Sequence, residues 1–256
     1  MTSRSPSSPE ASLAQKIEHT LLSPLATRAH IDRHCAEART HELLAVCVQP
    51  MWVPRCVELL RETPVLVVTV VGFPLGANTS NAKAFECATA LRQGAAEIDM
   101  VLALGPMKSG DRFGVRDDIA AVVKAADGRP VKVILETAYL SDAEKQLACA
   151  LAEEAGAQFV KTSTGFARQE FQAGPGQSLG ATVHDVRLLR ACVGERLGVK
   201  ASGGIRSAEL ARERTGFFLS FTISEGQRYN FGRVSVSSAI PGLDATAFQA
   251  LLAPVA

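Results

Sequence analysis

Short apolar runs alternate with amphipathic helical stretches from about Ile17 to Ile205. This rhythm is typical of repeated βα units built around a parallel sheet. Seven such units within about 190 residues favour a closed eight-stranded barrel over an open sheet. The sequence therefore predicts an α/β fold of the TIM (β/α)8 type, with seven recognisable βα strands and an atypical C-terminal segment in place of the eighth unit.

The individual elements follow from the hydrophobic period and from helix caps. The seven predicted strands are Ile17–Leu22, Leu44–Val48, Val65–Val71, Glu97–Leu102, Val131–Glu136, Phe159–Ser163 and Val199–Ser202. The predicted helices cover residues 27–39, 51–61, 80–92, 115–126, 142–154 and 183–193. Ser141 with Glu144 forms a capping box at the start of one helix, and Thr182 with Asp185 forms a weaker version at the next.

The pattern changes after the seventh unit. Phe217–Ile223 and Arg233–Ser237 alternate apolar and polar residues, as the strands of an antiparallel pair do. Asp244 is placed to cap a short helix that follows. The expected organisation is therefore a disordered tail at residues 1–12, a barrel at 13–210, and an atypical β-rich segment with a short helix at 211–256.

The composition limits the kinds of ligand that the chain can bind. With 27 basic and 26 acidic residues, its net charge of +1 leaves no field to attract nucleic acid or an anionic membrane. The low aromatic share of 5% argues against a stacking platform for bases, so the expected ligand is a small molecule. The six cysteines show no C-x-x-C spacing and no run reaches the length of a membrane span, so we expect reduced thiols and a cytoplasmic protein.

Two lysines stand at the carboxyl ends of the last two predicted strands. Lys161 precedes Thr-Ser-Thr-Gly and Lys200 precedes Ala-Ser-Gly-Gly, at the edge where α/β folds place their active sites. Period-two alternation is expected to turn both side chains into the barrel mouth. Two ammonium groups in one cavity lower each other's pKa, which favours an amine nucleophile and Schiff-base chemistry. For either lysine alone, a side chain that merely reaches solvent is the alternative.

Asp99 is an acidic residue inside an otherwise apolar strand. An inward carboxylate must be paired with a cation or with hydrogen-bond donors, and Lys161 and Lys200 are the expected partners. A purely structural ion pair in the barrel interior is the alternative interpretation. Glu97 shares the parity of Asp99 and is expected at the rim.

Glycines that follow the two lysines indicate an anion site. Gly203 and Gly204 end a strand and open a helix, so their backbone amides could hold a phosphate. Gly165 could add a further amide to the same site. A tight turn between a strand and a helix is the alternative for these glycines.

Cysteine and histidine positions were considered as further site residues. Cys47 ends a buried run and is expected to face the barrel interior, where it could line the substrate pocket or simply fill the core. His30 and His34 lie one helical turn apart, are expected on a solvated helix face, and have no third ligand close in sequence. We therefore expect neither a metal nor a cofactor.

These segments together resemble the deoxyribose-phosphate aldolases, a family of metal-free class I aldolases with a TIM-barrel fold. The matching segments are Ile17–Leu22, Val46–Val48, Val71–Gly76, Glu97–Val101, Lys108–Asp111, Lys132–Thr137, Phe159–Gly165 and Lys200–Arg206. The resemblance implies reversible cleavage of 2-deoxy-D-ribose 5-phosphate into D-glyceraldehyde 3-phosphate and acetaldehyde. It also implies that Lys161 forms the Schiff base, that Asp99 and Lys200 relay protons and tune the nucleophile, and that Gly165, Gly203 and Gly204 hold the phosphate.

The chain departs from that family at two places. Glu18 replaces the usual Asp of the first strand motif, which lengthens a carboxylate by one carbon. From about Ala211, the eighth βα unit that completes the phosphate site is replaced by a segment resembling POTRA repeats of outer-membrane assembly proteins. An open seven-stranded barrel would expose strand edges, and Arg233–Ser238 is the stretch considered for filling the gap.

Three functions stay open at the level of the sequence. The first is an aldolase that acts on a small sugar phosphate and acetaldehyde. The second is an inactive aldolase-derived scaffold whose C-terminal segment mediates protein contacts by strand addition. The third is another phosphate-handling barrel enzyme, such as a transaldolase-like enzyme or an isomerase. A homodimer is compatible with each of them.

Overall fold

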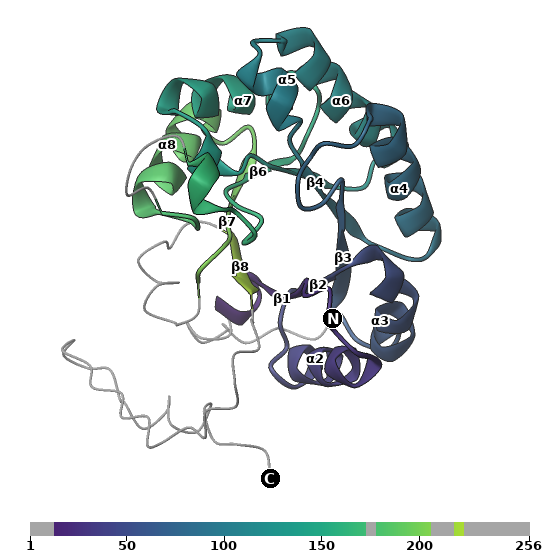
Figure 1. The fold of residues 1–256 in the computed structure, drawn as a ribbon. Helices are drawn as coiled ribbons and strands as arrows, with labels where there is room; N and C mark the ends of the chain where they lie inside the picture. Colours follow the sequence, from purple (N-terminus) through teal and green to yellow (C-terminus); the bar gives the residue numbers. More distant parts are fainter. Residues whose placement is uncertain (1–12, 173–177, 206–217, 223–256) are drawn as a thin grey trace, which may run out of the picture. The chain divides into compact units, whose positions relative to one another are not determined.

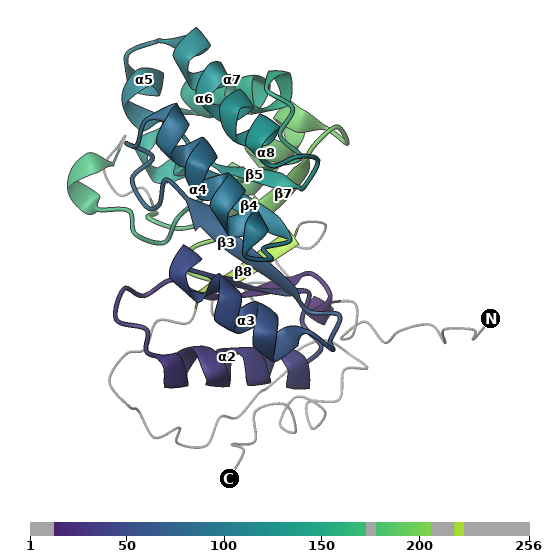
Figure 2. The same ribbon diagram turned by 90° about the vertical axis from the view of Figure 1, so that its right-hand side faces the viewer.

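The computed structural model describes residues 13–172, 178–205 and 218–222, and eight parallel strands in these ranges form a closed barrel. Helices surround the strands, as the view along the barrel shows (Figure 1). The view turned by 90° shows α2, α3 and α4 along the outside of the strands (Figure 2). The predicted TIM-barrel fold is therefore confirmed.

The strands follow one another around the barrel in chain order, each parallel to the next. They are β1 Ile17–Leu21, β2 Ala45–Val48, β3 Leu66–Val71, β4 Glu97–Val101, β5 Val131–Ile134, β6 Phe159–Lys161, β7 Gly198–Ala201 and β8 Phe218–Thr222. The first seven strands were all predicted, and their ends differ from the prediction by at most two residues.

The helices lie between the strands in sequence and outside them in space. They are α2 Arg28–Thr40, α3 Val53–Leu60, α4 Ser80–Arg92, α5 Leu104–Lys108, α6 Arg112–Ala125, α7 Asp142–Glu154 and α8 Val183–Val193. Short 3-10 turns add η1 Pro50–Trp52, η2 Thr137–Tyr139 and η3 Gln169–Phe171. The predicted helix at 51–61 covers most of η1 and all of α3, whereas α5, η2 and η3 were not predicted, because they are too short to show a hydrophobic period.

The helix caps behave as predicted. The Ser141 hydroxyl accepts a hydrogen bond from the Glu144 amide, and the Glu144 carboxylate accepts one from the Ser141 amide at 2.7 Å, which completes the capping box of α7. The Thr182 hydroxyl accepts from the Asp185 amide at 2.9 Å at the start of α8. These bonds satisfy amides that the first turn of a helix leaves without an intrahelical partner.

The prediction for the segment after residue 210 was wrong in one respect. β8 pairs in parallel with both β7 and β1, with Lys200 opposite Phe218 and Glu18 opposite Ser220, and it thereby closes the barrel. Alternation of apolar and polar residues identified this strand but does not encode its direction. β1 and β7 each have an edge that pairs in parallel with β8. An antiparallel hairpin formed away from them would leave both edges unpaired. The compact unit with the barrel ends at Ile223, and Arg233–Ser237 and the expected C-terminal helix lie outside the described residues.

Two apolar clusters stabilise this unit. The larger one lies between strands and helices and contains the outward-facing strand positions, such as Val46, Ile98 and Val199. The smaller one fills one side of the barrel interior with Ala45, Cys47, Val68 and Val70 from β2 and β3, together with Leu22. Because inward and outward positions alternate along each strand, the same alternation decides which side chains enter the interior.

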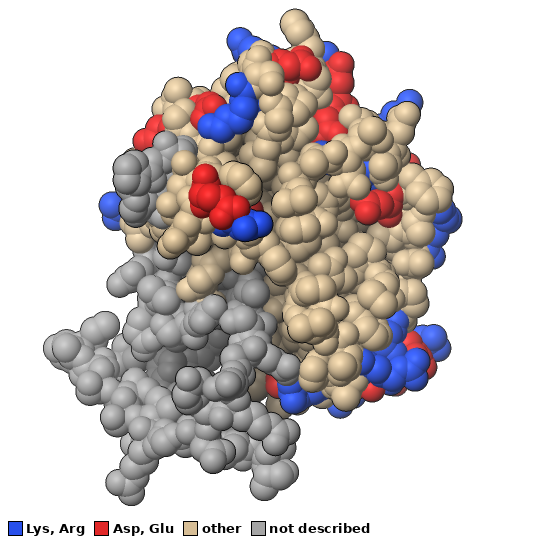
Figure 3. Space-filling model, in the orientation of Figure 1, with Lys and Arg blue, Asp and Glu red and all other residues tan. Residues whose placement is uncertain are grey.

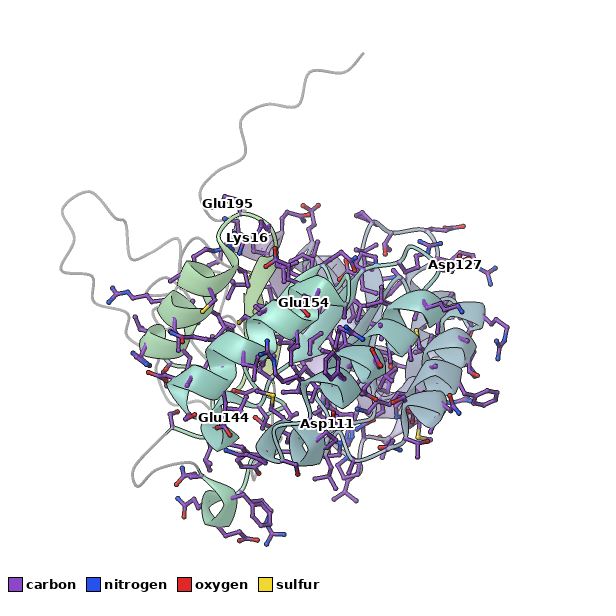
Figure 4. The ribbon with its side chains drawn as sticks, turned by 90° about the horizontal axis from the view of Figure 1, so that it is seen from above. Lys16, Asp111, Asp127, Glu144, Glu154 and Glu195 are labelled. Carbon is purple, nitrogen blue, oxygen red and sulfur yellow. The ribbon has the colours of Figure 1, made fainter. Side chains whose placement is uncertain are left out.

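The labelled residues in Figure 4 distinguish the two ends of the barrel. Asp111 and Glu144 belong to the starts of α6 and α7, and they lie on the side opposite Lys16, Asp127 and Glu195, which precede strands (Figure 4). The first side is therefore the one where strands end and helices begin, the side that carries active sites in this fold. None of the helices in the described ranges is long and apolar enough to span a membrane.

Candidate active site

Charged side chains occupy inward-facing positions of five barrel strands. Carboxylates come from β1 and β4 and ammonium groups from β5, β6 and β7, and the set consists of Glu18, Glu97, Asp99, Lys132, Lys161 and Lys200. All are buried except Glu97, whose side chain is 17% exposed. Each buried charge has an opposite charge within contact distance, which is the condition for keeping ions out of water. On the face shown in Figure 3, by contrast, charged groups gather mainly around the edge of the described surface.

Lys161, the last residue of β6, forms an ion pair with Asp99. The Lys161 Nζ donates to Asp99 Oδ2 at 2.5 Å, and Lys161 is 3% exposed. Burial alone would lower the pKa of Lys161, but the neighbouring Asp99, Cys47 and Glu18 groups outweigh burial and raise it above its ordinary value. The predicted contact between Lys161 and Asp99 is confirmed, and the expected depression of the Lys161 pKa is wrong.

Lys200 occupies the position opposite Lys161 on β7 but binds another carboxylate. Its Nζ lies 2.9 Å from Glu18 Oε1. Burial and the repulsion of Lys132 and Lys161 lower the pKa of Lys200 to about 8, although Glu18 opposes this shift. The expected effect of one ammonium group on another therefore holds for Lys200, but the expected contact with Asp99 is replaced by the contact with Glu18.

Lys132 is the second cation on Asp99 and was not assigned a role from the sequence. Its Nζ lies 2.9 Å from Asp99 Oδ1, 2.5 Å from Glu97 Oε2 and 3.2 Å from Glu18 Oε1. These carboxylates raise its pKa well above the ordinary value despite burial, so Lys132 stays an ammonium. A lysine between Val131 and Val133 in a strand is the signal that identifies it, because both valines face the helices.

The turns after β6 and β7 are fastened to each other by hydroxyl groups. The Thr162 hydroxyl donates to the Ser202 carbonyl at 2.9 Å and accepts from the Ser202 amide at 2.9 Å. The Ser202 hydroxyl donates to the Ser163 carbonyl at 2.5 Å and accepts from the Ser163 amide. Sequence reasoning treated these residues only as neighbours of the lysines, yet they fix the spacing of the two strand ends.

The three glycines of the predicted anion site lie in these turns. Gly165, Gly203 and Gly204 have φ values of 83°, 86° and 76°, which glycine adopts without steric penalty. No described residue accepts a hydrogen bond from any of their amides, and a Cβ added at Gly204 would meet open space. Free amides in turns of this kind can bind an anion.

Cys47 and the histidines take different places. Cys47 is fully buried on β2, and burial raises the pKa of its thiol to about 12, so it lines the interior as a neutral group beside the charged cluster. His34 was expected on a solvated face but is buried, with its ring stacked on His19 at 3.9 Å. The His34 Nε2 donates to the His19 carbonyl, and the His19 Nε2 bonds Glu37. The Nε2 atom of each histidine is therefore engaged within the protein.

Comparison with known proteins gives a consistent family. Residues 14–215 match the model of the DeoC/LacD family aldolases. The deoxyribose-phosphate aldolase of Brevibacillus brevis is 52% identical over 195 residues, covering 76% of this chain and 84% of that protein. The corresponding enzyme of Caldanaerobacter subterraneus subsp. tengcongensis is 53% identical over 203 residues, covering 78% of this chain and 84% of its own length.

A solved structure extends the match to the fold. The tetrameric deoxyribose phosphate aldolase of Aeropyrum pernix superposes with a TM-score of 0.72 at 32% identity, covering 83% of this chain and 87% of that one. The family match ends at residue 215, so the closing strand β8 lies beyond it. The sequence match, the barrel and the buried lysine cluster agree: the chain belongs to the DeoC/LacD family of aldolases.

Proposed function

We propose that the protein is a deoxyribose-phosphate aldolase that works through a Schiff base on Lys161. The substrate is 2-deoxy-D-ribose 5-phosphate, cleaved reversibly into D-glyceraldehyde 3-phosphate and acetaldehyde. The observation that carries this proposal is the buried Lys161 amine at the end of β6, in contact with Asp99 and next to Lys200 in register. Two relatives that are 52% and 53% identical over 195 and 203 aligned residues are deoxyribose-phosphate aldolases by name.

Lys161 must lose a proton before it can attack a carbonyl group. Its raised pKa keeps it an ammonium, and Asp99 Oδ2 is in contact to accept that proton. When the aldehyde enters, the ion pair between Lys161 and Asp99 separates, and the neutral Lys161 amine can attack the carbonyl group. Lys132 keeps Asp99 oriented through its other oxygen.

Imine formation conserves protons within the site. The Lys161 nitrogen adds to carbon 1 of the open-chain sugar, and the carbinolamine loses water to give an iminium. One proton that leaves nitrogen reaches the departing water by way of Asp99, and the other replaces the proton that Lys200 gives to the leaving hydroxyl. Lys200, which exchanges its proton near pH 8, is the group that we assign to protonate the leaving hydroxyl.

Cleavage then follows from the iminium acting as an electron sink. A base removes the proton of the carbon 3 hydroxyl, the bond between carbons 2 and 3 breaks, and its electron pair moves toward nitrogen. D-glyceraldehyde 3-phosphate leaves, and the enamine receives a proton at carbon 2. Water then adds to the new iminium and releases acetaldehyde and Lys161. The amides of Gly165, Gly203 and Gly204 hold the phosphate until D-glyceraldehyde 3-phosphate leaves.

A coupled retro-aldol assay with 2-deoxy-D-ribose 5-phosphate tests this function. We expect turnover in the wild-type chain and a loss of about a thousandfold or more in Lys161→Ala, the scale of removing a covalent nucleophile. Turnover of a different sugar phosphate with none of this one would favour a transaldolase-like or isomerase activity. A folded protein inert to all of them would favour the scaffold.

Location and assembly are part of the same proposal. We place the enzyme in the cytoplasm, because its six cysteines are free thiols and five of them are buried. We also propose a homodimer, supported by large apolar side chains exposed in the first three βα connections: Leu25 at 82%, Met51 at 74% and Leu75 at 67%. Light scattering of the full chain, with Met51→Lys as the interface variant, tests the assembly.

A further inference from the structure

Glu136 is a buried acid that the reaction above does not use. It follows β5 at the end of the barrel where the lysines lie, and it is 2% exposed. Its backbone has φ 54° and ψ 64°, the left-handed region that residues other than glycine seldom adopt. Non-glycine residues are held in that region where the surrounding structure fixes them, and such positions gather at functional sites.

Among the described residues, the Glu136 carboxyl group accepts hydrogen bonds from Thr164, in the turn that follows Lys161. The Thr164 amide donates to both carboxyl oxygens, at 3.3 and 3.4 Å, and the Thr164 hydroxyl donates to Oε2. The Thr164 hydroxyl oxygen in turn accepts from the Phe166 amide at 3.0 Å. Glu136 therefore holds the residue before Gly165 directly, and the Thr164 hydroxyl holds the residue after it.

Glu136 has no countercharge within the described ranges. No lysine, arginine or histidine there forms an ion pair with it, and burial raises its pKa to about 7 against the hydrogen bonds of Thr164. The charged groups of the adjoining strands, Lys132, Lys161 and Lys200, bind Asp99, Glu97 or Glu18 instead. In η2, the Tyr139 hydroxyl accepts from the Arg168 amide.

A phosphate monoester bound at Gly165 brings close to two negative charges next to the residue that Glu136 holds. Two like charges in one buried site disfavour ionisation of the weaker acid. The neutral form of Glu136 can still accept the Thr164 amide hydrogen bond, so protonation need not release the turn.

We propose that Glu136 is a positioning residue for the anion-binding turn and takes up a proton when a doubly charged phosphate binds there. The inference rests on the proposed function, because it takes Gly165 as part of the phosphate site. Phosphate affinity then falls as pH rises and Glu136 ionises in the free protein. Lys200, which titrates near pH 8, also changes phosphate affinity with pH. The contribution of Glu136 is therefore the difference in this pH dependence between wild type and a variant that lacks the Glu136 carboxyl group.

Sulfate is a suitable probe because it stays a dianion throughout this pH range. Calorimetry of the full chain at constant ionic strength should show sulfate affinity falling about 10-fold more in wild type than in Glu136→Gln between pH 6 and 8.5, within the usual range of coupling between two sites. At pH 8, repetition in buffers of different ionisation enthalpy should show greater proton uptake by wild type than by Glu136→Gln. The surface variant Glu154→Gln on α7 should match wild type in both measurements.

Thr164 provides a second test that keeps the Glu136 side chain in place. Thr164→Val should weaken sulfate and raise KM for the phosphorylated substrate more than it lowers kcat, and Thr164→Ser should restore both. Equal pH dependence and proton uptake in wild type and Glu136→Gln, or no sulfate binding in wild type, would overturn the proposal. Trapping of acetaldehyde on Lys161 does not require phosphate binding. A failure to trap acetaldehyde would therefore count against the proposed reaction itself.

Discussion

Lys161 and Lys200 are opposite one another in the parallel register of β6 and β7, yet their ammonium groups bind different carboxylates. Asp99 contacts Lys161 and Glu18 contacts Lys200. The pKa of Lys161 is raised as a result, whereas that of Lys200 is lowered to about 8. In the reaction that we propose, the two lysines have different roles: Lys161 is the nucleophile, and Lys200, with its pKa of about 8, transfers protons.

Replacing Asp99 tests its role as the proton acceptor of Lys161. Asp99→Asn should lower kcat by about 100-fold or more, the range for loss of a general base. Because the Asp99 carboxylate raises the Lys161 pKa, trapping of acetaldehyde on Lys161 should persist in the variant and extend to lower pH. Asp117→Asn, on the surface of α6, serves as the matched control. If Asp99→Asn keeps the wild-type kcat, Asp99 is not the proton acceptor of Lys161.

Replacing Glu18 tests the assignment of Lys200. Lys200 acts as a proton donor in its ammonium form, so activity should fall as pH rises through about 8. Glu18 stabilises that ammonium, and Glu18→Gln should therefore move the alkaline limb of kcat/KM down by about one pH unit. Steady-state rates from pH 6 to 9.5 measure this, with Glu154→Gln near the other end of α7 as a control. An unmoved limb would contradict the assignment.

Stability should respond to pH through Glu136. Its folded pKa, about 7, lies above the ordinary value of 4.5, so its contribution is fully present below pH 4.5 and is lost as pH rises through 7. Such a shift corresponds to about 3 kcal/mol at most. Glu136→Gln should be close to wild type in urea unfolding at pH 5 and more stable than wild type at pH 8.5. If the difference in unfolding free energy between wild type and Glu136→Gln is the same at both pH values, Glu136 does not titrate in this range.

The place of β8 gives a prediction about chain length. A chain ending at Ile223 keeps all eight strands, so it should unfold cooperatively and form the acetaldehyde adduct. A chain ending at Leu210 leaves the edges of β1 and β7 unpaired, which favours aggregation. Light scattering and circular dichroism of the two chains separate these outcomes. Equal solubility and equal cooperativity would show that β8 is dispensable for closure.

The sequence predicted those features that depend on local period. Strands β1 to β7 and the inward direction of Lys161, Lys200 and Asp99 follow from alternation in buried strands, and the structure confirms them. The contact between Asp99 and Lys161 could be anticipated because a buried carboxylate requires a cation.

The features that were missed depend on the closed geometry. Lys132 lies on the strand next to Asp99 and takes the place expected for Lys200, which requires the register of β4 with β5. Glu136 looked like the end of an apolar run, and its contact with Thr164 arises only when β5 and β6 lie side by side. His34 was assigned to solvent because its partner, His19, comes from another element. The direction of β8 is likewise set by two neighbours distant in sequence.

The most direct test of the account is to locate the covalent intermediate. The full chain is treated with acetaldehyde and borohydride, digested, and mapped by mass spectrometry. The account predicts an ethyl group on Lys161 ahead of exposed lysines such as Lys108, whose side chain is 45% exposed, and none at position 161 in Lys161→Ala. Modification of Lys200 in preference to Lys161, or of surface lysines alone in the folded protein, would contradict it.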